Sequence, residues 1–161
     1  MRKIILAVSL IAAVPAFAAG FDVPARKAGQ WKIEMNLPMG GGKAMTTELC
    51  LDENTDKQLM SAGIGMTPEC TTTQSGNGFD SVCTFGGMKT TSHVEMSGDF
   101  QSSYTMKITT DRVGGPAQLP KHSEITQTAT WEGACSGLAP GEMLMPGGMK
   151  INALKAMKPG G

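Results

Sequence analysis

The residues of this chain best suited to chemistry are its four cysteines, Cys50, Cys70, Cys83 and Cys135. Cysteines act as redox pairs, as metal ligands or as disulfide cross-links. A thioredoxin-like redox centre needs two cysteines separated by two residues, and the sequence has no such pair. A zinc site needs two close pairs of ligands, whereas 19, 12 and 51 residues separate these cysteines. The spacing therefore favours two disulfides.

A predicted hairpin indicates which cysteines pair. The stretch ECTTTQSGNGFDSVC places Gly76-Asn77 as a two-residue turn between two runs that are typical of strands. Around this turn Cys70 and Cys83 face each other directly, as a non-hydrogen-bonded pair. Such a pair has its Cα atoms ~4.5 Å apart, within the reach of a disulfide. We therefore expect one disulfide between Cys70 and Cys83, which leaves Cys50 to pair with Cys135.

Disulfides need an oxidising compartment, and the start of the chain predicts export to one. A basic start precedes an apolar run from Ile4 to Val14, and small residues then surround Phe17. This order is typical of a secretory signal peptide, and we expect cleavage after Ala18 to remove residues 1–18. The apolar run is shorter than the ~20 residues that cross a bilayer, so no membrane span is expected.

The charge of the remaining chain argues against two classes of partner. Without Arg2 and Lys3, 12 Lys and Arg residues oppose 14 Asp and Glu residues, and no basic cluster is present. Neither nucleic acid nor an anionic membrane surface is therefore an expected partner. The 21 glycines and 9 prolines lie between short alternating runs, which is typical of many turns and brief strands rather than of long helices.

Alternation of apolar and polar residues predicts about seven strands in one antiparallel sheet. The first two are residues 31–37 and 43–50, joined by a turn at 38–42. Two more flank the Gly76-Asn77 turn. A second hairpin joins 88–97 to 100–110 through a loop at 97–99, and the last strand is 122–132. One helix, of two turns at most, is expected to begin at the capping pair Thr55 and Gln58 and to end before Gly63.

A sheet of this size must cover its apolar face. We expect it to curl into a half-barrel or open barrel, with the helix and part of the tail over that face. The side chains predicted to line the concave side are Trp31, Ile33, Met35, Phe100, Tyr104, Met106 and Trp131. They could hold an apolar ligand, or they could form a packed core. Of the two interpretations, the sequence favours the packed core, with function on the surface.

Residues 136–161 differ in composition from the predicted domain at 19–135. They are rich in Gly, Pro and Met, and we expect them to form a loose or peripherally packed tail. Within this tail Met143, Met145 and Met149 carry thioethers, which are soft ligands suited to Cu(I). Copper binding is therefore the alternative function, and otherwise no cofactor is expected.

The sequence offers little for catalysis. Gly-x-Ser-x-Gly and His-Glu-x-x-His motifs are absent, and the glycine-rich runs at 40–43 and 76–78 join strands rather than precede a helix. The carboxylates Glu48, Asp80, Glu95 and Glu124 fall on outward or unassigned faces, where solvated charges are ordinary. We expect a protein that is not an enzyme.

Several short motifs occur in an order that resembles a known family. They are Gly29-Gln30-Trp31, Leu49-Cys50-Leu51, the Cys70 and Cys83 pair, Gly98-Asp99 followed by Tyr104-Thr105-Met106, and Gly133-Ala134-Cys135. From Ala25 to Cys135 the chain resembles the bacterial exported family catalogued as domain of unknown function 3617. The resemblance implies an envelope location and an antiparallel β fold, and it carries no activity. We expect a non-catalytic periplasmic protein of unknown role, for which an apolar ligand on the concave face and an envelope protein partner are the two candidate binding partners.

Overall fold

The computed structural model describes residues 23–36, 44–64 and 69–157, so the predicted signal peptide and the turn at 38–42 lie outside it. The strands are β1 (Gly29–Asn36), β2 (Ala44–Leu51), β3 (Cys70–Ser75), β4 (Gly78–Phe85), β5 (Met88–Gly98), β6 (Ser103–Val113), β7 (His122–Gly133), β8 (Glu142–Leu144) and β9 (Lys150–Asn152). The helices are α1 (Glu53–Ile64) and α2 (Ala153–Ala156). Within the described residues, no helix has the length and apolar character needed to cross a membrane.

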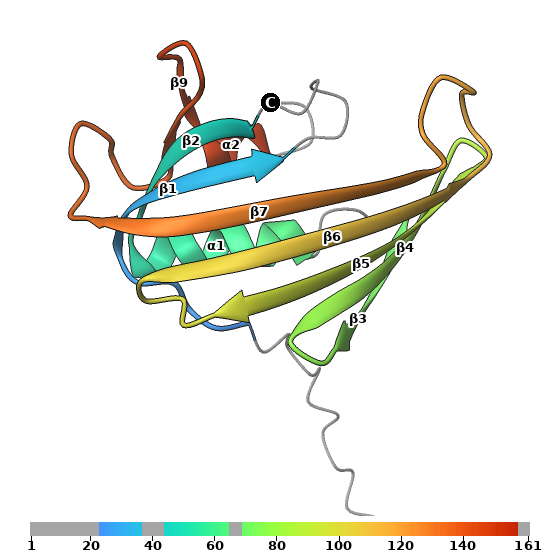
Figure 1. The fold of residues 1–161 in the computed structure, drawn as a ribbon, viewed down its shortest axis with the longest axis horizontal. Coiled ribbons are helices and arrows are strands. Elements are labelled where there is room, and N and C mark those ends of the chain that lie inside the picture. Colours follow the sequence, from blue (N-terminus) through green and yellow to red (C-terminus); the bar gives the residue numbers. More distant parts are fainter. Residues whose placement is uncertain (1–22, 37–43, 65–68, 158–161) are drawn as a thin grey trace, which may run out of the picture.

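The strands form one antiparallel sheet that is open rather than closed. Their order is β3-β4-β5-β6-β7-β1-β2-β8-β9, so β3 and β9 lie at opposite edges. Figure 1 shows the long strands β5, β6 and β7 curving across the molecule with α1 behind them. The prediction of an open, curled antiparallel sheet is confirmed. The described residues form nine strands instead of about seven, because β8 and β9 come from the tail.

The first hairpin has the register that its alternation predicts. Trp31 lies opposite Leu49, and Met35 lies opposite Met45. Directly opposed residues of an antiparallel pair share a face of the sheet. The apolar residues of β1 and β2 therefore point to the same side, as expected.

The loop between β5 and β6 differs from the prediction. β6 begins at Ser103 rather than at Phe100, because the carboxylate of Asp99 accepts hydrogen bonds from the backbone N–H groups of residues 101–103 at 2.7–3.1 Å. The Ser102 hydroxyl, which donates at 2.6 Å, and these backbone groups hold the pKa of Asp99 well below its usual range. Phe100 therefore lies in a loop, at a positive φ of 57°, with its side chain buried.

Helix α1 begins earlier than predicted. Asp52 caps it, since its Oδ1 accepts a hydrogen bond from the backbone N–H of Thr55 at 2.6 Å. The predicted cap, Thr55, is instead buried in the first turn together with Asp56. The expected capping box of Thr55 and Gln58 is thus wrong, because an acidic acceptor three residues earlier captures the free N–H group. The helix is twelve residues long and buries Leu59 against the sheet.

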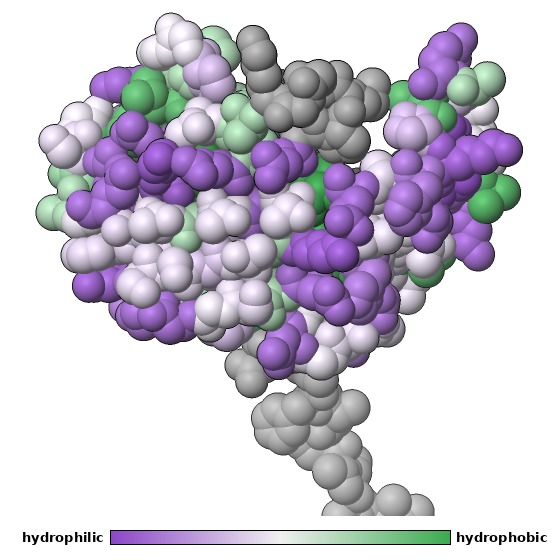
Figure 2. Space-filling model, viewed as in Figure 1, coloured by the Kyte–Doolittle hydropathy of each residue, from purple (hydrophilic) through white to green (hydrophobic). Residues whose placement is uncertain are grey.

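The two faces of the sheet differ in chemistry. Figure 2 shows that the outer face, over β5, β6 and β7, carries hydrophilic and intermediate side chains. Many of these are threonines, as in Thr105, Thr128 and Thr130. The inner face carries the core, whose buried members are Trp31, Ile33, Leu49, Leu51, Leu59, Val94, Met96, Phe100, Tyr104, Ala129 and Ala153.

The tail packs against the edge of the sheet. β8 pairs with β2, and β9 pairs with β8. Leu138 and Ala153 are buried, and Asn152 caps α2 by accepting a hydrogen bond from the backbone N–H of Lys155 at 3.0 Å. The described part of this segment, residues 136–157, packs at the periphery of the sheet.

Candidate ligand-binding site

Aromatic rings fill one end of the inner face. We call this region, formed by Trp31, Phe100 and Tyr104, the aromatic end. The ring centroid of Tyr104 lies 5.4 Å from that of Trp31 and 5.2 Å from that of Phe100, on which it stacks. Trp31 is 0% exposed, and its Nε1 donates to the carbonyl of Lys27 at 2.8 Å, so the buried indole has its polar atom satisfied. This end of the face is packed core.

Trp131 lies at the rim of the aromatic end. It is opposite Trp31 in the pairing of β1 with β7, and its Nε1 donates to the carbonyl of Ala28 at 3.1 Å. The ammonium of Lys27 lies 3.5 Å from the centroid of the Trp131 ring, which is a cation–π contact. Trp131 therefore holds the segment that precedes β1, and it is not among the residues that line the cavity described below.

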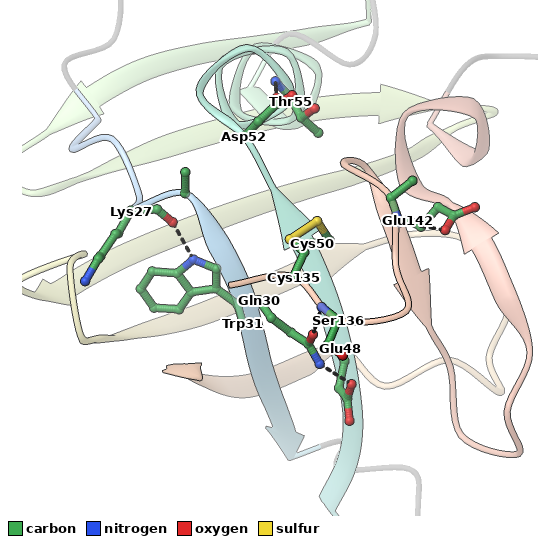
Figure 3. Close-up of a disulfide and its surroundings, with 12 residues drawn as sticks. Lys27, Gln30, Trp31, Glu48, Cys50, Asp52, Thr55, Cys135, Ser136 and Glu142 are labelled. Carbon is green, nitrogen blue, oxygen red and sulfur yellow. Dashed lines mark hydrogen bonds between the residues drawn. A yellow bond between two sulfur atoms is a disulfide. The ribbon is translucent and has the colours of Figure 1, made fainter. Parts of the chain in front are cut away.

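A disulfide joins the tail to the sheet beside the aromatic end. It links Cys50 of β2 to Cys135, which follows β7, with the Cα atoms 5.5 Å apart. This is the second pair expected from the sequence, once the predicted hairpin pairs Cys70 with Cys83. Figure 3 shows the bond near Trp31, with the Gln30 side chain accepting a hydrogen bond from the backbone N–H of Ser136 at 2.9 Å. The chain that enters the tail is thus held by a covalent bond and by a polar contact.

The second disulfide lies near the opposite edge of the sheet. It joins Cys70 of β3 to Cys83 of β4, the directly opposed pair that the hairpin arithmetic predicts. The Cα atoms are 4.0 Å apart. This bond staples a single hairpin, whereas the bond between Cys50 and Cys135 joins segments that are 85 residues apart.

The rest of the inner face holds a cavity of about 510 Å³, and we call this region the methionine end. Small-molecule sites typically have volumes of ~300–1,000 Å³. Six of the lining residues are methionines, and Arg26 and Gln127 are the polar ones. The full lining is Arg26, Ile33, Met35, Leu49, Leu59, Met60, Phe79, Val94, Met96, Met106, Ile108, Gln127, Met143, Ala153 and Met157.

Strand register brings the methionines together. Met35 of β1, Gln127 of β7, Met106 of β6 and Met96 of β5 lie in one row across the sheet. Because opposed residues share a face, all four point inward. α1 adds Met60, and the tail adds the remaining methionines. Unbranched thioether side chains fill irregular space and change rotamer easily, so the shape of this lining is adaptable.

A polar cluster of Arg26, Asp56, Tyr104 and Gln127 lies at the wall of the cavity. Arg26 donates from Nε to Asp56 Oδ1 at 2.6 Å and from its backbone N–H to Asp56 Oδ2 at 3.0 Å. The hydroxyl of Tyr104 accepts from Arg26 Nη1 at 3.2 Å and from Gln127 Nε2 at 3.4 Å. Burial by itself lowers the pKa of Arg26, but Tyr104 and Asp56 raise it more, so the guanidinium stays charged.

The structure brings together only part of the predicted ligand-facing set. Ile33, Met35 and Met106 line the cavity. The four aromatic residues of that set instead form the aromatic end and its rim. Sequence reasoning missed Arg26 because this residue precedes the first strand, where periodicity assigns no face. It also missed Gln127, although a glutamine on the apolar side of β7 was a signal of a buried polar group.

The methionines of the copper alternative occupy different surroundings. Met143 lines the cavity, whereas Met149 is 61% exposed. The backbone N–H of Met145 donates to the carbonyl of Met149 at 2.8 Å. Among the residues that the structure describes, no group of three or more His, Cys, Asp or Glu side chains could hold a metal ion.

Comparison with protein families gives a match over most of the chain. The sequence model of the family described as "Protein of unknown function (DUF3617)" matches residues 26–135. Searches of curated proteins and of solved structures found no match. The matched region begins at Arg26 in the cavity wall and ends at Cys135 of the long disulfide. It contains the aromatic end, whereas Met143, Ala153 and Met157 of the cavity lining follow it. The chain therefore belongs to the DUF3617 family, whose function is unknown.

Proposed function

We propose that this protein is a non-catalytic periplasmic module that holds an apolar small molecule in the methionine end. The observation that carries the proposal is the cavity of about 510 Å³ with its almost wholly apolar lining. Burial of apolar ligand surface against such a lining is favourable by ~25 cal/mol per Å². The binding energy would come from the hydrocarbon part of the guest, and the polar cluster would orient it.

The contrast with the aromatic end supports a binding site over an imperfect core. The same sheet face packs tightly around Trp31 and Tyr104, so nothing in the backbone prevents close packing. A void in a core costs the contacts that its lining atoms would otherwise make. A guest that fills the cavity would supply these missing contacts and would thereby stabilise the protein.

The proposed periplasmic location has two supports. The first residues have the order of a signal peptide. The two disulfides are stable in an oxidising compartment and rare in the cytoplasm. Both observations favour a location outside the inner membrane.

The chemistry of the lining supports a non-catalytic role. A charged guanidinium and an amide suit recognition, because neither takes up or releases a proton near neutral pH. The described lining of the cavity contains no Ser, Cys, His, Asp or Glu, and thus no nucleophile paired with a base.

Native mass spectrometry of protein purified from its own periplasm tests the proposal. We expect a fraction of the protein to carry the added mass of an apolar molecule that organic solvent removes. Bound copper in place of such a mass would favour the methionine alternative. A bare chain that also fails to take up an apolar dye would contradict the proposal and would favour a role in contacting an envelope protein.

Filling the cavity tests where the molecule binds. Met106→Phe and Ile33→Phe place a ring in the cavity, and we expect each to weaken binding of the dye 1-N-phenylnaphthylamine about 10-fold. Thr128→Leu is the matched control, because Thr128 lies on the outer face of the same sheet. Equal affinities in all three variants and the wild type would show that the dye binds elsewhere.

A further inference from the structure

The polar cluster at the cavity wall contains a balanced pair of charges. The side chain of Arg26 is 10% exposed and that of Asp56 is 3% exposed. Both carboxylate oxygens accept from Arg26, one from Nε and the other from the backbone N–H. The guanidinium therefore reaches the cavity with its positive charge already offset by a carboxylate that it contacts directly.

Hydrogen-bonding capacity nevertheless remains in this cluster. Within the described residues, Arg26 Nη2 and Gln127 Oε1 have no hydrogen-bond partner. Among the described residues, no side-chain nitrogen or oxygen is both fully buried and without a partner. Both residues line the cavity, and Gln127 is only 9% exposed. A donor and an acceptor are thus available to a guest.

We propose that the guest is an uncharged amphiphile with a hydrocarbon tail and an ester, amide or ketone head; this inference rests on the proposed function. The tail lies among the methionines. The carbonyl oxygen of the head accepts from Arg26 Nη2. A hydroxyl in the same head can donate to Gln127 Oε1, so a head that carries both groups uses the whole cluster.

Charge complementarity favours a neutral head over a carboxylate. A carboxylate at Nη2 would meet the attraction of the guanidinium together with the repulsion of Asp56, which lies 2.6 Å from Nε of the same group. It would also lose its hydration on entering an apolar cavity. A carbonyl oxygen gains a charge-assisted hydrogen bond without either cost.

Competition against 1-N-phenylnaphthylamine with two matched probes, methyl decanoate and decanoate, tests the head. Any apolar cavity disfavours a carboxylate, so the diagnostic quantity is how the ratio of the two affinities changes with Asp56. Asp56→Asn leaves the charge of Arg26 unopposed. We expect this variant to shift the ratio toward decanoate by about 10-fold. Glu34→Gln, which removes a carboxylate from the outer face, is the control and should leave the ratio unchanged.

A second variant keeps the test decisive if Asp56→Asn does not fold. The double change Arg26→Met with Asp56→Leu removes both charges, and such replacements of buried ion pairs are often tolerated. We expect it to weaken the binding of methyl decanoate about 10-fold more than it weakens the binding of the dye. Circular dichroism checks the fold of each variant.

The outcomes separate this inference from the proposed function. Absence of dye binding to the wild-type protein would overturn the proposed function itself. Dye binding with an unchanged ratio in Asp56→Asn, or with undiminished ester affinity in the double variant, would leave the cavity as a binding site and overturn the neutral head. Tighter binding of decanoate than of methyl decanoate to the wild-type protein would also overturn the neutral head.

Discussion

The two ends of the inner face are built from the same strands and differ in how they are filled. β1 supplies Trp31 to the aromatic end and Met35 to the methionine end, and β6 supplies Tyr104 and Met106 in the same way. The rings pack closely, with centroids 5.2–5.4 Å apart, whereas the thioethers surround a cavity of about 510 Å³. Rings are rigid and define one packing, while methionine has three rotatable bonds. The choice of side chain thus decides where the inner face of this sheet is close-packed and where it leaves a cavity.

From this contrast we expect the aromatic end to contribute more to stability and the methionine end to be more adaptable. The aromatic end is also the end next to the disulfide between Cys50 and Cys135 (Figure 3). Unbranched thioether side chains give the methionine end more freedom to change rotamer than the end that is filled by rings. The effect of a substitution on unfolding should therefore depend on which end it touches.

The largest effect is expected from the disulfide beside the aromatic end. Its cysteines are 85 residues apart, against 13 for the other disulfide, and in the chain-entropy model the two bonds contribute ~4.5 and ~3 kcal/mol. Replacing Cys50 and Cys135 by Ala should lower the free energy of unfolding by ~1.5 kcal/mol more than replacing Cys70 and Cys83. Urea denaturation of the two double variants measures this difference. A greater loss of unfolding free energy on removal of the disulfide between Cys70 and Cys83 would contradict the conclusion that the aromatic end is the more stabilising one.

Truncation of one side chain at each end comes next. Trp31→Ala should lower the free energy of unfolding by about 3–5 kcal/mol, because it removes a fully buried ring from a close-packed region. Met106→Ala should cost only about 1–2 kcal/mol, since Met106 is half-buried beside an existing cavity. Urea denaturation compares them, and equal losses would contradict the distinction between the two ends.

Added volume should have a smaller effect that again differs between the ends. Ala129 is 0% exposed and lies opposite Tyr104, so Ala129→Leu should cost about 1–3 kcal/mol through overpacking. Ile108 lines the cavity, and Ile108→Phe should change the free energy of unfolding by less than about 1 kcal/mol. Thermal unfolding of both variants provides the measurement. A larger cost for Ile108→Phe would show that the cavity does not accept added volume.

The smallest effect is expected on the outer face, behind the methionine end. His93 Nδ1 lies 2.6 Å from Asp80 Oδ1, and this hydrogen bond raises the pKa of His93 above its usual 6.5. A group whose pKa is higher in the folded than in the unfolded protein stabilises the fold at pH values below its unfolded pKa. This stabilisation is lost as the pH rises through the pKa of the folded protein. Because the pair is exposed, Asp80→Asn should lower the urea midpoint only slightly.

The pH dependence identifies the source of that small change. The difference between Asp80→Asn and wild type should be present at about pH 6 and should shrink as the pH rises through the raised pKa of His93. Urea midpoints measured across this range follow the difference. A difference that grows with pH would mean that Asp80 acts through another partner.

The sheet was largely predictable because each hairpin carries its own register. Alternation from Trp31 to Met35 and the turn at Gly76 assign faces without any knowledge of the tertiary structure. The loop at Phe100 was not predictable in this way, because the side chain of Asp99 replaces a standard turn. β8 has only three residues, and its place beside β2 depends on tertiary contacts.

The cavity was only partly predictable. Periodicity places Met35 and Met106 on the inner face, but whether a face is filled depends on how the helix and tail pack over it. Met143 illustrates this limit, since it reaches the cavity from the edge of the sheet. Arg26 belongs to no helix or strand, and its position follows from its ion pair with Asp56.

The methyl resonances of the methionines test the central claim most directly, because the chain carries reporters inside and outside the cavity. In protein with ¹³C-labelled methionine methyl groups, titration with 1-N-phenylnaphthylamine should shift the signals of Met35, Met60, Met96, Met106, Met143 and Met157. The exposed Met149 should stay unchanged. Shifts confined to the six cavity methionines are the result that we predict. Shifts centred on Met149, or none at all at saturating dye, would contradict a binding site in the methionine end.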